Sequence, residues 1–220
     1  MTDKKVKVIA DGPYQVTGGV ALDLLRYITN HKGYSVDYDR MKKYPERETY
    51  FLCRCGDSKN KPYCDGAHKQ VGFVGTETAS HAAYDDMAKC IEGKLMDLMD
   101  AEELCSVARF CDTKSGTWNL IETAENLDAK DIITHQCKFC PSGRLTAVTK
   151  QGERLEPYLP QEISMLEDPL IHKVAPIWVK GGIQIEDANG KPYPVRNRVT
   201  LCCCGKSQNK PFCDATHVDE

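Results

Sequence analysis

The chain has 220 residues, 41% of them hydrophobic, and a net charge of −3, a composition typical of a soluble globular protein with room for two or three small domains. Its 29 basic and 32 acidic residues form no basic stripe, which argues against nucleic acid as a partner. No apolar run is long enough to span a membrane and the first residues lack a signal-peptide core, so we expect a cytoplasmic protein with no membrane partner.

Twelve cysteines are the most informative part of the composition. In a reducing compartment such a number is typical of metal binding or redox work rather than of disulfides. The spacing of the cysteines indicates three candidate metal sites along the chain.

The first candidate site lies in CRCGDSKNKPYCDGAH, from Cys53 to His68. In an extended segment residues i and i+2 point to one side, so Cys53 and Cys55 can bind one iron together. Cys64 and His68 are four residues apart, which places them on one face of a helical turn. Three thiolates and one imidazole give two ligands to each iron of a 2Fe–2S cluster. A structural zinc site is the alternative, although zinc sites usually use C-x2–4-C knuckles.

The middle of the chain is predicted to be mainly helical. Residues 81–111, HAAYDDMAKCIEGKLMDLMDAEELCSVARFC, carry apolar residues at i+3/i+4 spacing, which predicts one helix. Residues 127–137, LDAKDIITHQC, predict a second helix. Residues 146–157, TAVTKQGERLEP, predict a short hairpin with its turn at Gln151-Gly152.

The second candidate site involves Cys105, Cys111, Cys137 and Cys140 of this middle segment. The Cys105-x5-Cys111 pair and the later Cys140-Pro141 resemble a monocluster bacterial ferredoxin, in which such residues hold one cubane-type cluster. The resemblance, from about Asp100 to Gly152, implies a 3Fe–4S cluster on Cys105, Cys111 and Cys140, or a 4Fe–4S cluster if Cys137 is the fourth ligand. Ala108 stands where the ordinary pattern has a further cysteine. Buried thiols or a four-cysteine zinc site are the alternatives.

The third candidate site, CCCGKSQNKPFCDATH, repeats the first, with ten of sixteen positions identical. The repeat extends upstream, since PYQVTGG (13–19) is echoed by PIWVKGG (176–182). The alignment predicts as ligands Cys202, Cys204, Cys213 and His217. Cys203 aligns with Arg54, so we expect Cys203 to bind no metal.

Both copies match C-x-C-x2-S-x3-P-x-C-D-x-x-H and resemble the CDGSH, or mitoNEET-like, iron–sulfur family. The resemblance implies a 2Fe–2S cluster in each copy. Cys53 and Cys55 would hold the inner iron, Cys64 and His68 the outer, exposed iron, and the second copy likewise. Ala215 replaces the glycine of the family motif.

The resemblance also implies an α+β fold. In the family two such units form a strand-exchanged β-sandwich, so we expect the two copies to pair as an intramolecular pseudo-dimer of the β-cradle type. The predicted domains are a first repeat at 1–75, an inserted helix-rich ferredoxin-like domain at 76–168, and a second repeat at 169–220. With both copies on one chain we expect a monomer.

The predicted function is electron transfer without catalysis, because no nucleophile–base pair or phosphate loop accompanies the metal motifs. An imidazole ligand should raise the potential above that of an all-cysteine cluster. The first alternative is a cluster donor or a redox or pH sensor, since a histidine ligand can be protonated. The second alternative is a zinc-binding scaffold. The expected partners are redox proteins or apo iron–sulfur acceptors.

Overall fold

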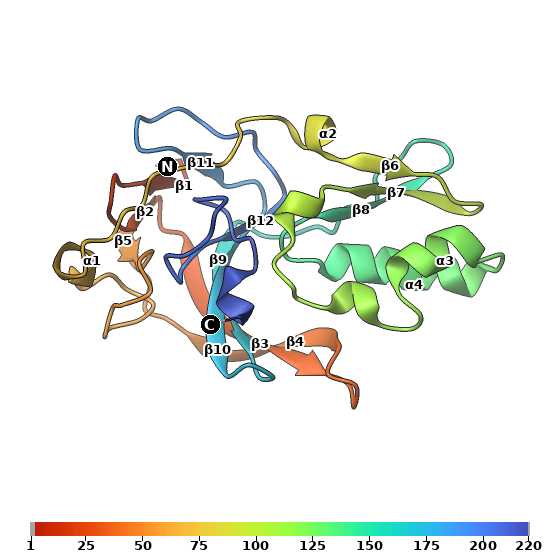
Figure 1. Cartoon of the computed structure of the whole chain (residues 1–220), viewed down its shortest axis with the longest axis horizontal. Helices are drawn as coiled ribbons and strands as arrows, with labels where there is room; N and C mark the ends of the chain where they lie inside the picture. Colours follow the sequence, from red (N-terminus) through yellow and green to blue (C-terminus); the bar gives the residue numbers. More distant parts are fainter. Residues whose placement is uncertain (1–2, 220) are drawn as a thin grey trace.

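The computed structural model describes residues 3–219, which form two packed sheets and a smaller sheet with its own helices (Figure 1). In chain order the strands, α-helices and 3-10 helices (η) are β1 (Lys5–Val8), β2 (Tyr14–Thr17), β3 (Ala21–Thr29), β4 (Ser35–Lys43), β5 (Thr49–Leu52), α1 (Ala67–Gln70), α2 (Tyr84–Met87), β6 (Lys89–Ile91), β7 (Met96–Asp100), η1 (Glu102–Leu104), η2 (Phe110–Asp112), α3 (Thr117–Thr123), α4 (Leu127–Phe139), β8 (Leu145–Thr149), β9 (Glu162–Asp168), β10 (Lys173–Lys180), β11 (Gln184–Glu186), β12 (Arg198–Leu201) and η3 (Thr216–Val218). The fold is α+β, as predicted.

The two large sheets each contain strands from both halves of the chain. The four-stranded sheet has the order β11-β1-β2-β5, so a strand of the second repeat completes the strands of the first. The five-stranded sheet has the order β12-β10-β9-β3-β4, so β3 of the first repeat joins the strands of the second. β11 runs parallel to β1, and β3 runs parallel to β9. The second half therefore supplies β11 to the four-stranded sheet, and the first half supplies β3, with β4 paired to it, to the five-stranded sheet.

The strand registers of the two sheets correspond residue by residue. Tyr14 lies opposite Leu52, as Ile177 lies opposite Leu201 in the aligned strands. The pairing of β1 with β2 is likewise repeated by that of β9 with β10. β1 and β9 are thus a further pair of corresponding strands. The sequence comparison missed them because KVKV and EISM share only their alternation of apolar residues.

The sheets meet through apolar side chains from alternate strand positions. Val6, Val16 and Leu52 of the four-stranded sheet belong to one buried core with Ile163 and Leu201 of the five-stranded sheet. Two sheets packed face to face in this way share a core about 10 Å thick. The core therefore belongs to both repeats at once.

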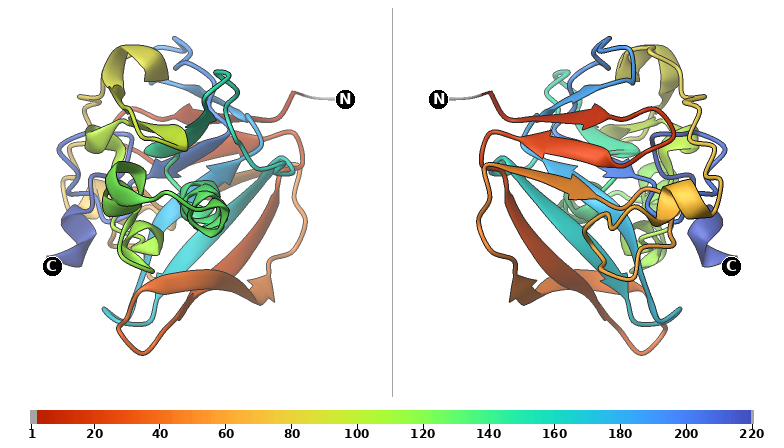
Figure 2. Two further views of the ribbon diagram at one scale, coloured as in Figure 1. Left: turned by 90° about the vertical axis from the view of Figure 1, so that its right-hand side faces the viewer. Right: turned by 90° about the vertical axis from the view of Figure 1, so that its left-hand side faces the viewer.

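The outer faces of the two sheets differ. β1, β2 and β5 alternate buried with more exposed residues, the pattern of a sheet with one face toward solvent. Every residue of β12 is buried, because the middle segment covers the outer face of the five-stranded sheet. There the Tyr38 ring lies 4.9 Å from the rings of both Phe110 and Trp178. In the left view of Figure 2 the green helices of the middle segment lie in front of this sheet.

The predicted helix over residues 81–111 is wrong. The structure has the short helix α2, the strands β6 and β7, and the 3-10 helices η1 and η2 in this range. In β7 the residues Met96, Leu98 and Asp100 are buried and their neighbours are not, which is the two-residue period of a strand. Gly93 forms the turn between β6 and β7, where a Cβ would lie only 2.5 Å from the Ile121 carbonyl oxygen.

The other two predicted elements of the middle segment are confirmed. α4 spans the predicted helix, and the Asn126 side chain accepts a hydrogen bond from the Ala129 amide at its start, 3.0 Å away. The hairpin after β8 turns where predicted, with the Gly152 amide donating to the Thr149 carbonyl at 2.8 Å. α3, α4 and the sheet β6-β7-β8 enclose a small core that contains Leu98, Ile133 and Cys137.

The predicted domain boundaries stay predictions. β9 lies before residue 169, the predicted start of the second repeat, yet it pairs with β10 of that repeat and with β3 of the first. Among residues 3–219, no helix combines the length and the apolar character needed to cross a membrane.

The residues before α1 and η3 give a matched test of backbone strain. Gly66 has φ 92° and Ala215 has φ 71°, both in the left-handed region that costs a residue with a Cβ about 1–2 kcal/mol. We predict that Ala215→Gly stabilises the protein by about 1 kcal/mol and that Gly66→Ala destabilises it by a similar amount. No atom lies within 4 Å of a Cβ built on Gly66, so that change adds no clash. Denaturant unfolding of the two variants measures both changes in the free energy of unfolding. Changes of the same sign would contradict the prediction.

Candidate metal centres

The four predicted ligands of the first site form two pairs. The Sγ atoms of Cys53 and Cys55, directly after β5, lie 3.8 Å apart. The Cys64 Sγ lies 3.3 Å from the Nδ1 atom of His68, which is in α1. Backbone hydrogen bonds from Cys53 to the Pro62 carbonyl and from Cys64 to the Phe51 carbonyl hold the two pairs on one loop.

The loop between the pairs is stabilised by residues that the motif shares between copies. The Ser58 hydroxyl donates to the Tyr63 carbonyl at 2.6 Å and accepts from the Asn60 amide. The Asp65 carboxylate accepts hydrogen bonds from the amides of Ala67 and Lys59, which lower its pKa. Asp65 thus precedes the N-cap of α1 by one residue and fixes the position of the turn that carries His68. Ser207 and Asp214 make the equivalent contacts in the second copy.

The second site repeats the paired arrangement. The Sγ atoms of Cys202 and Cys204 are 3.6 Å apart, and the Cys213 Sγ is 3.4 Å from Nδ1 of His217. The first repeat also contacts this site, because the buried Tyr14 hydroxyl is 2.8 Å from the Cys202 carbonyl oxygen and 3.0 Å from that of Pro211.

These separations fit tetrahedral metal coordination. Two thiolates bound at about 2.3 Å with tetrahedral angles lie about 3.8 Å apart, and a thiolate and an imidazole about 3.5 Å. Within residues 3–219, no three Cys, His, Asp or Glu side chains are grouped closely enough to hold a single ion. Two separate pairs match a two-iron cluster, in which each iron takes two protein ligands, better than a single zinc ion, which takes all four.

The loops of the two sites are in direct contact. A Cβ on Gly56 would lie 2.7 Å from the Cys204 carbonyl oxygen, and one on Gly205 would lie 2.4 Å from the Cys55 carbonyl oxygen. Both glycines also have positive φ. Glycine is therefore required at both positions for the two sites to approach each other.

The two sites differ in their exposure. Cys64 and His68 are half-buried, whereas Cys213 and His217 are only 3% and 4% exposed. Burial lowers the pKa of His217, and the Lys173 ammonium donates to the His217 carbonyl at 2.9 Å. The Cys213–His217 pair is therefore enclosed by protein, whereas the Cys64–His68 pair of the first site is more exposed to solvent.

The residue between the first two cysteines of each site points away from the ligands. The Arg54 side chain is 2% exposed and donates to the carbonyls of Ile9 and Gly75. Cys203 lies in the shared core, 3.7 Å from the Val174 carbonyl. Arg54 and Cys203 thus pack and hydrogen-bond in place of binding metal.

In the middle segment, Cys105, Cys111 and Cys140 line one cavity of about 180 Å³. In a cubane-type cluster each thiolate binds a different iron, so the thiolates must be spread around a cavity and not converge on a single ion. The arrangement of these three cysteines fits such a cluster. Ala108 lines the same cavity, where the ordinary ferredoxin pattern has a cysteine. Cys137 does not line it and is 1% exposed within the core below α4.

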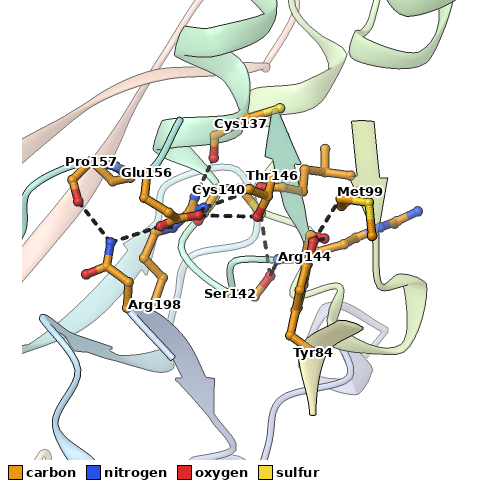
Figure 3. A network of polar contacts seen from close by, with 12 residues as sticks. Tyr84, Met99, Cys137, Cys140, Ser142, Arg144, Thr146, Glu156, Pro157 and Arg198 are labelled. Carbon is orange, nitrogen blue, oxygen red and sulfur yellow. Dashed lines mark hydrogen bonds and ion pairs between the residues drawn. The ribbon is translucent and has the colours of Figure 1, made fainter. Parts of the chain in front are cut away.

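Cys140 is held by an arginine from the second repeat (Figure 3). Arg198 lies on β12, four residues before Cys202, and is 2% exposed. Its guanidinium donates to the carbonyls of Cys137 and Cys140, the latter at 2.9 Å, and forms an ion pair with Glu156. No sequence pattern points to this role, because the aligned residue of the first copy is Thr49.

The middle cavity also lies close to the second site. The Asn209 side-chain amide, in the loop of the second site, donates to the Glu103 carbonyl at 3.2 Å. Cys105, which lines the middle cavity, follows Glu103 by two residues. The three candidate centres therefore form a contiguous series with the second site in the centre.

Comparison with known families identifies all three segments. Residues 11–69 and 175–218 match the family described as iron-binding zinc finger CDGSH type. Residues 91–150 match the family described as divergent 4Fe-4S mono-cluster. Both resemblances predicted from the motifs are thereby confirmed. Searches of curated proteins and of solved structures gave no match.

The contrast between Cys203 and Cys202 tests the ligand set. We predict that Cys203→Ser keeps the iron content and visible absorption of the wild type, because this side chain lies in the core. Cys202→Ser should lose or alter the second centre, because it removes one member of a ligand pair. Iron analysis and absorption spectra of both variants check this, and loss of the centre in Cys203→Ser would contradict it.

A second pair of variants tests the middle centre. Cys137→Ala should keep the electron paramagnetic resonance (EPR) signal of this centre and lose about 1–2 kcal/mol of stability, because it leaves a small void in the core. Cys140→Ala should lose the signal, because Cys140 lines the cavity. If Cys137→Ala abolishes the signal, Cys137 is a ligand.

Proposed function

Because the chain carries two CDGSH-type segments on either side of a divergent 4Fe–4S mono-cluster segment, we propose that this iron–sulfur protein is a non-enzymatic electron carrier with three centres. Two centres would be 2Fe–2S clusters with three cysteines and one histidine each. The third would be a 3Fe–4S or 4Fe–4S cluster. Such clusters supply one-electron redox chemistry when bound.

The ligand roles follow from the paired geometry. Cys53 and Cys55, like Cys202 and Cys204, would hold the iron nearer the protein core, since each pair directly follows a strand, β5 or β12, that contributes side chains to that core. Cys64 with His68, and Cys213 with His217, would hold the other iron. Cys105, Cys111 and Cys140 would hold the third cluster. The imidazole nitrogens should raise the potentials of the first two centres above those of all-cysteine clusters.

The observation that carries the proposal is the contiguity of the three sites. The loops of the first and second sites touch at Gly56 and Gly205. The cavity lined by Cys105 is joined to the loop of the second site through the contact of Asn209 with Glu103. Centres placed side by side, with one open to solvent, suit the passage of electrons through the chain better than storage of a structural ion.

The corresponding strands also support an intramolecular pseudo-dimer of the β-cradle type, since each sheet combines both repeats. Because one chain supplies both halves of the core, we expect a monomer.

The second candidate function is donation of a cluster to an apo-protein. It is favoured by the half-buried positions of Cys64 and His68, which an acceptor's thiolates could reach. The buried Cys213 and His217 lack this access, so the first centre would be the one donated.

Metal and acid-labile sulfide analysis of anaerobically purified protein, together with EPR, tests the proposal. We predict iron and sulfide in amounts that correspond to three clusters, and reversible reduction of each without loss of iron. Colourless protein that contains zinc would contradict the iron–sulfur assignment. Irreversible loss of the first centre to apo-ferredoxin, without electron exchange, would favour cluster donation instead.

A further inference from the structure

Two arginines line the cavity that contains the three predicted ligands of the middle centre. Arg109 forms an ion pair with Asp168, and Arg144 forms one with Asp100. Neither of these two carboxylates lines the cavity, so the cationic end of each pair is the one nearer to it. Among the residues of 3–219 that line the cavity, the one carboxylate is that of Asp112, which is exposed to solvent. The buried wall of the cavity is therefore positively charged.

The two arginines differ in how their N–H groups are used. All three nitrogens of the Arg109 guanidinium donate to protein oxygens, those of Asp168 and of two backbone carbonyls. Arg144 donates from Nε and Nη2 to the two oxygens of Asp100, at 2.6 and 2.9 Å, which leaves Nη1 outside this pairing. Burial would lower the pKa of Arg144, but its interactions with Asp100 and the Cys105 thiol outweigh that effect and raise it. Arg144 is therefore the arginine whose charge acts on a predicted ligand.

The position of Arg144 is fixed from several sides. Its guanidinium carbon lies 5.0 Å from the centre of the Trp118 ring, and the Trp118 Nε1 atom donates to the Asp100 carboxylate at 3.0 Å. The Arg144 carbonyl accepts hydrogen bonds from the Ala101 amide at 3.1 Å and from the Tyr84 hydroxyl at 2.8 Å (Figure 3). The side chains of Arg144 and Asp100 are 16% and 11% exposed, so water screens their charges only in part.

We propose that Arg144 raises the reduction potential of the middle centre by holding a positive charge beside Cys105, an inference that rests on the cluster assignment in the proposed function. A cluster that takes up one electron gains one negative charge, and a nearby cation favours this reduced form. Local charge and hydrogen bonds to the sulfurs are among the factors that set the potential of such a cluster. Arg144 acts through the ligand Cys105 and is not a ligand itself, since a guanidinium offers no acceptor atom.

The potential of the middle centre can be measured on the loaded full-length chain by a redox titration with dithionite, followed by EPR. We expect Arg144→Gln to make reduction of this centre about tenfold less favourable, a shift of about 59 mV to lower potential. Arg144→Lys keeps the charge and should remain closer to the wild type. Asp100→Asn should shift the potential upward, because it removes the negative charge that opposes the guanidinium.

A second ion pair of the same strand supplies matched controls. Asp97 of β7 lies three residues before Asp100 and pairs with Lys150 at 2.6 Å. Neither Asp97 nor Lys150 lines the cavity. Lys150→Gln and Asp97→Asn therefore make the same changes of charge in the middle segment, and each should shift the potential less than its counterpart at the cavity.

The signs of the shifts separate an effect of charge from structural damage. Shifts of the same sign in Arg144→Gln and Asp100→Asn, or shifts no larger than those of the controls, would overturn the proposal. If Arg144→Gln loses the centre, the sign for Asp100→Asn decides. Loss of the centre in both variants would make the ion pair structural and overturn the proposal as well.

The outcomes also separate the role of Arg144 from the proposed function. A middle segment that contains zinc, or no metal, would overturn this inference together with the third cluster. The predicted shifts in a chain that passes no electrons to cytochrome c would reject the electron-carrier function alone. Unshifted potentials in a chain that does reduce cytochrome c would reject the role of Arg144 alone.

Discussion

The exchange of β3 and β11 between the two halves of the chain is the constraint on which the remaining structure depends. Each large sheet includes a strand of the other half beside its own strands, with β4 added at the edge next to β3, and the core between the sheets is shared. The cysteine loops leave these sheets directly after β5 and β12, so the sheets fix where both loops lie. The contact of the loops at Gly56 and Gly205, and the hydrogen bonds of Tyr14 to the second loop, are consequences of that pairing.

The middle segment is joined to this framework by apolar packing and by two partly buried ion pairs, Arg109 with Asp168 of β9 and Arg198 with Glu156. Phe110 and Phe139 of the middle segment pack against Tyr38 on the outer face of the five-stranded sheet, and Arg198 reaches from β12 to the loop of Cys140. A buried guanidinium without partners would be strongly destabilising. Glu156 and the carbonyls around Arg198 are therefore required to compensate the burial of its charge. The position of Cys140 therefore depends on a strand of the second repeat as well as on α4.

The sequence predicted the parts of the structure that repeat or that follow local rules. Two copies of one motif predicted which side chains lie together in pairs, and the alignment of Arg54 with Cys203 predicted that both lie outside these pairs. Residues 81–111 were mispredicted because apolar residues of two short strands happened to fall at helical spacing, while the alternating burial of β7 appears only once its partners are in place. Arg198 could not be predicted either, since its role arises from a contact between segments about 60 residues apart, which no local pattern encodes.

The position of both repeats on one chain has a consequence for how the two halves can change. In a dimer of identical subunits, the twofold axis gives every residue at the interface an identical counterpart, so both sites must have the same neighbours. Here Arg54 corresponds to Cys203 and Asp57 to Lys206, and the middle segment covers one large sheet and leaves the other bare. Two repeats on one chain are free of this shared constraint. A substitution in one repeat then changes only that half of the molecule. One repeat can therefore adapt to the interior of the molecule while the other adapts to solvent.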